Sequence, residues 1–221
     1  LTFAAGAFSI TGVISGSGGL QSSANQLLLD TANTYSGPTV INAGFLTIRT
    51  GFALGAFAAG TTVNVGARLV LDNNIIVPEP ITLSGTLRNV VGTNTVTGNI
   101  VLTTNAIVEV LTNTAVILSN VLSGVGGVIK TGPGTLKFAG NSANTYADAT
   151  EVQSGTLLLG KTAGITAVPG ALEIGDGTGG ANADVVRLQA NSQIADSSPV
   201  TINSSGLLDS DGFTEVIGEL S

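Results

Sequence analysis

The stretch from Gly124 to Gly160 reads GVGGVIKTGPGTLKFAGNSANTYADATEVQSGTLLLG, and it decides how the rest of the chain is interpreted. Its apolar runs are short, at Val128-Ile129, Leu136–Phe138 and Leu157–Leu159, and Gly, Pro, Asn and Ser separate them. Short apolar runs between frequent turn residues predict brief β-strands, and no helical period of 3.6 residues is present. The stretch therefore predicts an all-β fold.

A second copy of this pattern lies upstream. The segment GSGGL before the first run corresponds to GVGGV in the later stretch, and an Asn-Thr-Tyr triplet follows in both copies. From Tyr35 to Gly44 and from Tyr146 to Gly155 the spacing is the same nine residues. The chain is thus predicted to be one domain, residues 1–221, with internal repeats at about 10–74 and about 117–211.

Composition excludes several classes of partner and chemistry. The 221 residues include no Cys, so there is no disulfide framework, and the net charge is −7. Residues 1–147 carry five bases and four acids, whereas residues 148–221 carry two bases and ten acids. Because phosphate is bound mainly by Lys and Arg, nucleic acid is not an expected partner. No apolar run is long enough for a spanning helix, so membrane insertion of this segment is not expected.

Strand length distinguishes the all-β architectures. A sandwich predicts strands of five or more residues with clean alternation, but many runs here have three or four. Short strands, Gly-rich corners and a long repeat favour a parallel β-helix. Coils of about twenty residues predict roughly eleven coils and a rod about 50 Å long. Pro78 and Pro80 predict a corner. The Ala/Phe/Gly stretch from Phe52 to Gly60 is interpreted as a looser loop, with Phe52, Leu54 and Phe57 as candidates to seal a core edge.

The motif residues resemble a known family. Gly126–Leu136, Asn144–Tyr146 and Ser154–Leu157 are similar to the autotransporter-associated β-strand repeat, also called the passenger-associated repeat, of large bacterial surface and secreted proteins. In the first copy, residues 21–26 (QSSANQ) replace the Lys-Thr-Gly-Pro-Gly turn. The resemblance implies a right-handed, single-stranded parallel β-helix, secretion, and a structural or adhesive role. It provides no family active site to carry over.

Candidate reactive residues are few. The absence of His and Cys excludes Ser-His-Asp and Cys-His catalysis and most zinc sites. Asp209 with Asp211, and Asp176 with Asp184, are candidate carboxylate pairs for sugar cleavage or Ca²⁺ binding. All lie in Gly/Ser-rich segments, where Asp commonly forms turns. We therefore predict no catalytic residue, no cofactor and no metal site, and interpret these acids as solvated corners.

Two further patterns have structural interpretations. Tyr35 and Tyr146 occupy equivalent positions and could form a stacking platform for carbohydrate, but a corner tyrosine that packs on the next coil is the favoured interpretation. The Gly-rich segment Gly16–Gly19 resembles a phosphate-binding loop only superficially, because neither a helix nor a lysine follows it.

The sequence predicts a non-enzymatic structural or adhesive module of a bacterial cell-surface or extracellular protein. It would serve as a stalk, an adhesin passenger or a filament subunit. Neither end shows a polar cap, so expected partners are further copies stacked end to end in a fibre, or other surface and matrix components. The alternative function is a carbohydrate-acting β-helix enzyme or a carbohydrate-binding module.

Overall fold

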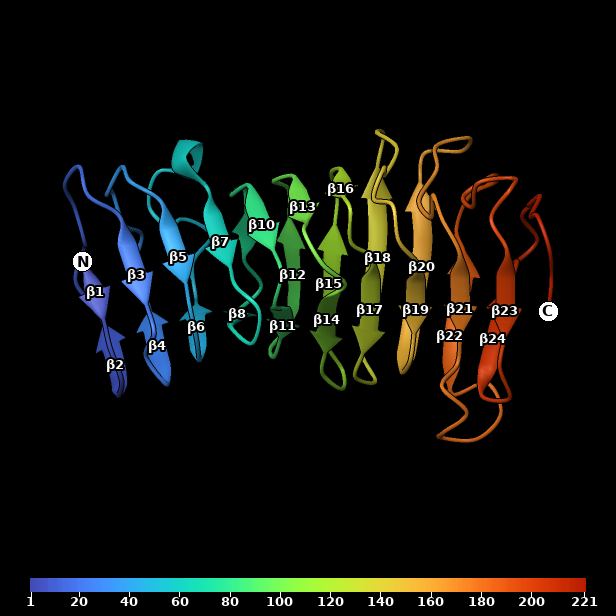
Figure 1. The fold of residues 1–221 in the computed structure, drawn as a ribbon, viewed down its shortest axis with the longest axis horizontal. Coiled ribbons are helices and arrows are strands. Elements are labelled where there is room, and N and C mark those ends of the chain that lie inside the picture. The colour runs from blue at the N-terminus through green and yellow to red at the C-terminus, as the bar shows by residue number, and fades with distance from the viewer.

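The computed structural model describes all 221 residues as one elongated solenoid of parallel β-strands (Figure 1). The chain advances along the long axis from the N-terminal to the C-terminal end, and strands of one coil pair with strands of the next. The pairings are parallel, for example between Leu27 and Leu46 or between Leu136 and Leu157. The prediction of an all-β parallel β-helix is confirmed.

Three sheets form the faces of the solenoid, and the chain visits them in the order A, B, C. Sheet A consists of β1 (Thr2–Phe3), β3 (Leu20–Ser22), β5 (Thr39–Ile41), β7 (Thr61–Val63), β10 (Ile81–Leu83), β13 (Ile100–Leu102) and β16 (Leu122–Gly124). Sheet B consists of β2 (Ala7–Ile10), β4 (Gln26–Leu29), β6 (Phe45–Ile48), β8 (Arg68–Leu71), β11 (Thr86–Asn89), β14 (Ala106–Val110), β17 (Val128–Thr131), β19 (Thr150–Val152), β21 (Leu172–Ile174) and β23 (Val200–Ile202). Sheet C consists of β9 (Ile76–Val77), β12 (Thr93–Val96), β15 (Ala115–Leu118), β18 (Thr135–Gly140), β20 (Gly155–Lys161), β22 (Asp184–Leu188) and β24 (Gly206–Asp209).

Sheet B runs the whole length of the solenoid and its ten strands count about ten coils, close to the roughly eleven predicted. Early coils are short: Phe8 pairs with Leu27, nineteen residues later. Late coils are longer, because Ile174 pairs with Ile202, twenty-eight residues later. Surface loops lengthen the late coils, so the chain completes slightly fewer coils than a fixed period of twenty would give.

The core is a continuous column of inward-facing apolar side chains. A typical three-residue strand buries its first and last residues and leaves the middle one facing outward, as in β10. Leu27, Leu46, Leu69 and Leu87 stack in register on successive coils, about 4.8 Å apart. In all, 44 buried residues form a single cluster. Because each coil buries its apolar residues against both neighbours, coil stacking supplies most of the stability.

The strands are not distributed evenly over the three faces. Early coils have no strand on face C, where residues 30–38 run in irregular conformation between β4 and β5. Middle coils carry strands on all three faces. After β16 the strands lie on faces B and C alone, and residues 141–149 occupy face A between β18 and β19. The irregular side has therefore moved by one face.

The predictions for individual residues are confirmed in part. Pro78 and Pro80 lie at the corner between β9 and β10, as predicted. Of the three residues expected to seal a core edge, only Leu54 is buried, whereas Phe52 and Phe57 are 55% and 53% exposed. Phe57 begins the 3-10 turn η1 (Phe57–Ala59), which projects from the solenoid (Figure 1). No helix in the structure has the length and apolar character needed to span a membrane.

Candidate functional site

The two repeat copies use the same strand pairings, although one is 108 residues further along the chain. In the first copy Leu20 pairs with Thr39, and in the second Val128 pairs with Thr150. The next strands repeat the correspondence, with the pair Leu27–Leu46 matched by Leu136–Leu157. Each copy therefore folds as the same unit: a strand, a corner, a second strand, an irregular side, and two further strands stacked on the first two.

A buried asparagine joins three coils in each copy. Asn33 Oδ1 accepts a hydrogen bond from Ile14 N–H (2.8 Å) below, and its Nδ2 donates to the carbonyl of Ala53 (2.6 Å) above. Asn144 does the same, accepting from Leu122 N–H (3.0 Å) and donating to Ala167 O (2.8 Å). Residues 30–38 and 141–149 form no regular strand, and the asparagine amide supplies hydrogen-bond partners that such a strand would provide.

A buried tyrosine follows each asparagine. The hydroxyl of Tyr35 bonds to Thr39 Oγ1, and that of Tyr146 bonds to Thr150 Oγ1. Burial raises the pKa of Tyr35 to about 12, and it also raises the pKa of Tyr146. Both rings are almost completely buried. Both tyrosines are thus interior residues of the irregular side, and neither ring offers a stacking surface to carbohydrate.

A glycine opens the last strand of each copy because the coil below approaches closely. Gly44 has φ +66 and Gly155 has φ +74, both in the left-handed region. A Cβ atom at Gly44 would collide with the carbonyl oxygen of Ala24, and one at Gly155 with that of Gly132. Both requirements favour glycine, which explains the constant tyrosine-to-glycine spacing in the sequence.

The copies differ in the faces that they occupy. The first copy places its strands on sheets A and B, and its irregular side on face C. The second copy places its strands on sheets B and C, and its irregular side on face A. Along sheet B, β17 lies five coils beyond β4, so equivalent strands of the two copies are separated by five coils and one face. The unit has rotated about the solenoid axis by one face.

Comparison with known families identifies the unit. A family profile described as the passenger-associated-transport-repeat matches residues 22–48 and 128–159, which are the two segments whose contacts correspond. Two segments of the chain thus match this repeat, and we call them the first and second transport repeats. The first match is shorter partly because it begins at Ser22, which corresponds to Lys130, so it starts two residues later in the unit. Its corner also has one residue fewer, and Tyr35 follows Leu27 by eight residues, whereas Tyr146 follows Leu136 by ten.

A curated relative also matches. The chain is 31% identical over 138 residues to the protein named "Adhesin BmaC autotransporter" of Brucella suis biovar 1 (strain 1330). The match covers 60% of this chain and 3% of that much longer protein. No solved structure matches the chain.

The second transport repeat contains a buried lysine that sequence reasoning missed. Lys130 is fully buried, and its Nζ donates to the carbonyls of Thr131 (3.0 Å), Gly132 (2.6 Å) and Ser154 (2.8 Å). Burial lowers the pKa of Lys130 to about 8, an effect that the charge of Asp184 partly offsets. The ammonium thus links its own corner to the coil above.

The equivalent residue in the first transport repeat is Ser22. It pairs with Phe3 and Ile41 as Lys130 pairs with Val108 and Val152. Ser22 is fully buried, but its hydroxyl oxygen has no hydrogen-bond partner. The first copy therefore lacks the ammonium link.

A second buried lysine lies at the end of the second transport repeat. Lys161 Nζ donates to Asn120 O (3.1 Å) and to Ala139 O (3.0 Å), which lie on the two preceding coils. Burial lowers its pKa to about 8. In the first copy the corresponding position is Thr50, which makes no such link. Buried lysines whose ammonium groups donate to backbone carbonyls are thus specific to the second copy. Sequence reasoning missed them because glycine-rich surroundings do not indicate burial.

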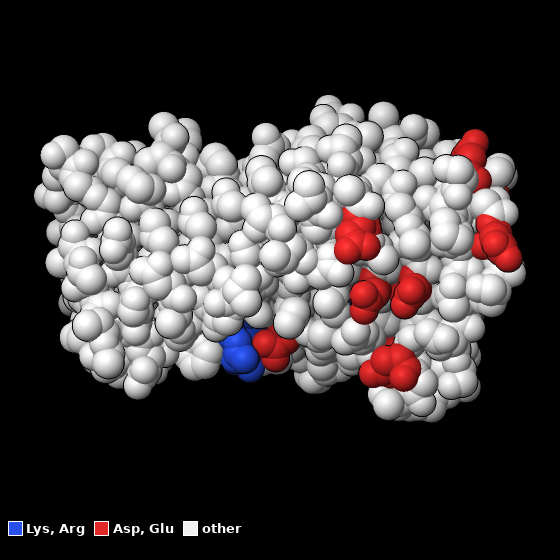
Figure 2. Space-filling model, in the orientation of Figure 1, with Lys and Arg blue, Asp and Glu red and all other residues white.

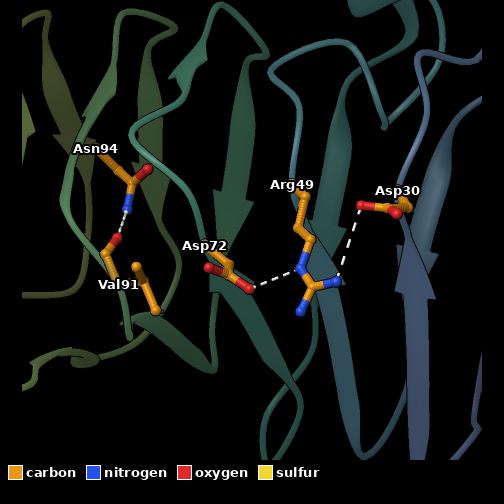
Figure 3. Close-up of polar contacts among 5 residues, drawn as sticks. All are labelled: Asp30, Arg49, Asp72, Val91 and Asn94. Atoms are coloured by element: carbon orange, nitrogen blue, oxygen red, sulfur yellow. Dashed lines mark hydrogen bonds and ion pairs between the residues drawn. The ribbon is translucent and has the colours of Figure 1, made fainter.

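The first transport repeat has a surface ion pair instead. Arg49 Nε lies 2.8 Å from Asp72 Oδ2, and its Nη1 lies 3.9 Å from Asp30 Oδ1, so one guanidinium joins three coils (Figure 3). The hydrogen bond with Asp72 raises the pKa of Arg49. Figure 3 also shows Asn94, a buried asparagine of the middle coils, donating to Val91 O at 2.9 Å.

The acids considered for catalysis have other roles. Asp209 accepts hydrogen bonds from Asp211 N–H (2.9 Å) and Arg187 Nε (2.7 Å), and these bonds lower its pKa. Asp176 accepts from the amide and hydroxyl of Thr178, which lowers its pKa as well. Both carboxylates are therefore held ionised, so neither Asp209 nor Asp176 is suited to act as a general acid.

Asp184 is the buried member of the other pair. It accepts a hydrogen bond from Ser205 Oγ (2.6 Å), and the same Ser205 oxygen accepts from Gly177 N–H (3.0 Å). It holds the corner in place, whereas its partner Asp176 is exposed. The chain contains no group of three or more acidic side chains placed to hold a metal ion.

Charge is segregated along the rod. Figure 2 shows a face that is free of charged side chains towards the N-terminal end and carries several acids towards the C-terminal end. Glu151 and Glu173 contribute to this distribution, since they face outward on neighbouring strands of sheet B and are paired in register. The charge asymmetry in the sequence is thus a spatial asymmetry of the surface.

Proposed function

We propose that this chain is a stiff structural and adhesive segment of a secreted bacterial cell-surface protein. One observation carries the proposal: two transport repeats lie within an uninterrupted stack of about ten coils. Asparagine, lysine and arginine side chains each join three coils or bridge two, which resists bending between coils. A rigid rod holds binding surfaces further from a cell than a compact domain with the same number of residues would.

The similarity to an adhesin supports the extracellular part of the proposal. The matching protein is named an adhesin and an autotransporter, and a passenger-associated repeat occurs twice here. Adhesion, export and partners of the whole protein are proposals for this chain, because the chain spans only 3% of that relative. Self-association by end-to-end stacking stays a prediction, which sedimentation velocity at rising concentration tests.

The surface supports a non-catalytic role. The three hollows on the surface are lined by no Asp or Glu side chain, and the Asp176 and Asp209 carboxylates are engaged in their own turns. A sugar-cleaving enzyme needs two carboxyl groups flanking one cleft. Hydrolysis of a polysaccharide that Asp209→Asn or Asp176→Asn abolishes would show that the enzymatic alternative is correct.

Two measurements test the proposal. Negative-stain electron microscopy of the purified chain should show rods about 45 Å long, from nine coil spacings of about 4.8 Å. Beads coated with the folded chain should be retained on bacterial or epithelial cell surfaces at least fivefold more than beads coated with heat-unfolded chain. Rods without retention would contradict the adhesive part, and compact particles would contradict the structural part.

A further inference from the structure

Two hollows lie in line along the outer surface of sheet A. One, of about 390 Å³, is lined by the outward side chains Thr62, Thr82 and Val101 on three successive coils. The other, of about 360 Å³, is lined by Gln21 and Val40 on the preceding coils. Because Val40 and Thr62 are paired neighbours, the two hollows adjoin.

The residues at the floor of these hollows also repeat from coil to coil. Gly19, Pro38, Gly60, Pro80 and Asn99 each lie two residues before the outward residue of their strand, and all five line one of the hollows. We call the combined depression the sheet A furrow. It crosses six coils from Thr2 to Val101, a length of about 24 Å at 4.8 Å per coil.

The backbone along the furrow is already hydrogen-bonded. The carbonyls of Pro38, Gly60 and Pro80 accept from the amides of the coil below, as in Thr61 N–H to Pro80 O at 2.9 Å. An extended peptide therefore cannot bind there by adding a strand, which requires an unpaired edge. A partner must use the side chains.

The side chains of the furrow offer neutral polar groups. Gln21, Thr62, Thr82 and Asn99 make no side-chain hydrogen bond within the chain and face outward at the spacing of the coils. Between them lie the apolar surfaces of proline and valine. No charged side chain lines either hollow, because Glu79 at the adjacent corner is turned inward and only 2% exposed.

We propose that the sheet A furrow binds a neutral polysaccharide chain lengthwise along the rod, an inference that rests on the proposed adhesive function. A polymer of uncharged sugars presents hydroxyl groups at regular intervals and apolar ring faces between them. Hydroxyl and amide side chains on five of the six coils (Thr2, Gln21, Thr62, Thr82 and Asn99) match the first feature. The proline and valine surfaces match the second. The absence of cationic side chains disfavours nucleic acid and acidic polysaccharides.

The furrow ends at Val101 on β13, two coils before the irregular side of the second transport repeat crosses face A. Thr145 of the irregular side continues the sheet A column, because its amide donates to Leu122 O (2.8 Å) in register with Ser123. Beyond it, residues 162–171 and 189–199 form irregular segments over the same face. The furrow therefore lies entirely within the near-neutral half of the rod, before the irregular segments that cover face A after β16.

Affinity electrophoresis and calorimetry with soluble galactomannan and hydroxyethyl cellulose test the inference, with polygalacturonate as an acidic comparison. The double substitution Thr62→Lys with Thr82→Lys obstructs the furrow. The matched control is Thr95→Lys with Thr47→Lys, which alters two outward threonines on sheets C and B. Circular dichroism and rod length in electron micrographs confirm that both variants fold.

We expect at least one of the two neutral polymers to bind the unmodified chain, with an affinity that changes less than twofold between 50 and 500 mM NaCl. The furrow variant should bind at least tenfold more weakly and the control within twofold of the unmodified chain. Equal loss in both variants, binding to polygalacturonate alone, or no binding to either neutral polymer overturns the inference. If coated beads still adhere to cells in that case, the proposed adhesive function survives without the furrow.

Discussion

The two transport repeats make the same contacts on different faces of one solenoid. In both, an asparagine joins three coils, a tyrosine bonds to a threonine, and a left-handed glycine admits the coil below. The first uses sheets A and B, however, and the second uses sheets B and C. The repeat therefore specifies a local unit of two strands and a corner, and the lengths of the coils in between decide which faces it takes.

The copies also differ in how they fill the same corner. Lys130 places an ammonium among three carbonyls, whereas Ser22 leaves a buried hydroxyl without a partner. The first copy compensates with the ion pair of Arg49 on the surface. The same unit thus tolerates different polar links between coils.

The largest expected effect comes from the shared asparagine. Asn33→Ala or Asn144→Ala leaves a buried N–H and a buried C=O without partners, so each should lower the free energy of unfolding by about 3 kcal/mol. Urea denaturation measures the loss, and hydrogen exchange should show it at Ile14 or Leu122. Asn141→Ala, at an exposed position in the same segment, is the control and should cost less than about 0.5 kcal/mol. A large loss in one copy only would mean that the units are not equivalent.

Substitution at the differing corner should separate the copies. Lys130→Met removes the donor from three carbonyls and should lower the free energy of unfolding by about 2 kcal/mol. Ser22→Ala removes an unpaired buried hydroxyl and should change it by less than about 0.5 kcal/mol, or stabilise the chain slightly. Urea midpoints of the two variants provide the comparison. A Lys130→Met variant as stable as the unmodified chain would show that the ammonium link is dispensable.

The pH dependence of stability should have opposite signs near the two copies. Burial raises the pKa of Glu79, beside the first copy, from 4.5 to about 7. The folded state then binds more protons than the unfolded state between these values, so stability falls as pH rises from 4.5 to 7. Solvent screening limits the loss to about 2 kcal/mol. Glu79→Gln should remove this part of the pH profile.

The lysines of the second copy should affect stability at a higher pH than Glu79 does. The pKa of Lys130 falls from 10.5 to about 8 on folding, so the unfolded state binds more protons between these values. Stability should therefore rise with pH from 8 to 10.5, and Lys130→Met should reduce that rise. Thermal denaturation across pH 4.5–10.5 measures both slopes. Profiles of Glu79→Gln or Lys130→Met that parallel the unmodified chain would contradict these assignments.

The smallest effect is expected for the ion pair specific to the first copy. The Arg49 side chain is 44% exposed, so Arg49→Ala should lower the midpoint of thermal unfolding less than Asn33→Ala or Lys130→Met does, and the difference should shrink in 0.5 M NaCl. Thermal denaturation at two salt concentrations measures it. Arg49→Lys is the matched variant, because it keeps the charge and loses the directional bond to Asp72. A loss as large as that of Asn33→Ala, unchanged by salt, would mean that Arg49 acts through packing.

The fold could be predicted because the strands and corners of each coil are indicated by the local sequence. Runs such as Leu27–Leu29 or Leu157–Leu159 alternate between core and surface, and the Tyr-to-Gly spacing marks stacked coils. The structural role of Tyr35 and Tyr146 followed from their equivalence. These features depend on neighbouring residues and the next coil alone.

The rotation of the repeat could not be predicted in this way. Corners of a three-sided solenoid are locally alike, so the face taken by Val128 depends on the summed length of all coils since Leu20, and each coil varies in length. Burial of Lys130 was missed because a lysine beside Gly and Pro is typical of exposed turns. Phe52 and Phe57 were candidates to seal a core edge because they are apolar, but both lie exposed in the loop between β6 and β7.

Cysteine cross-linking tests the central claim, the rotation of the second transport repeat, most directly, because the chain has no native Cys. Thr145 lies in register with Ser123 on face A, so Ser123→Cys with Thr145→Cys should form a disulfide in high yield under mild oxidation. Ile117→Cys with Thr145→Cys should not, because Ile117 faces outward from sheet C. In the first copy, Ser15→Cys with Thr34→Cys should cross-link and Gln21→Cys with Thr34→Cys should not. Cross-linking of Thr145→Cys to Ile117→Cys in place of Ser123→Cys would contradict the rotation.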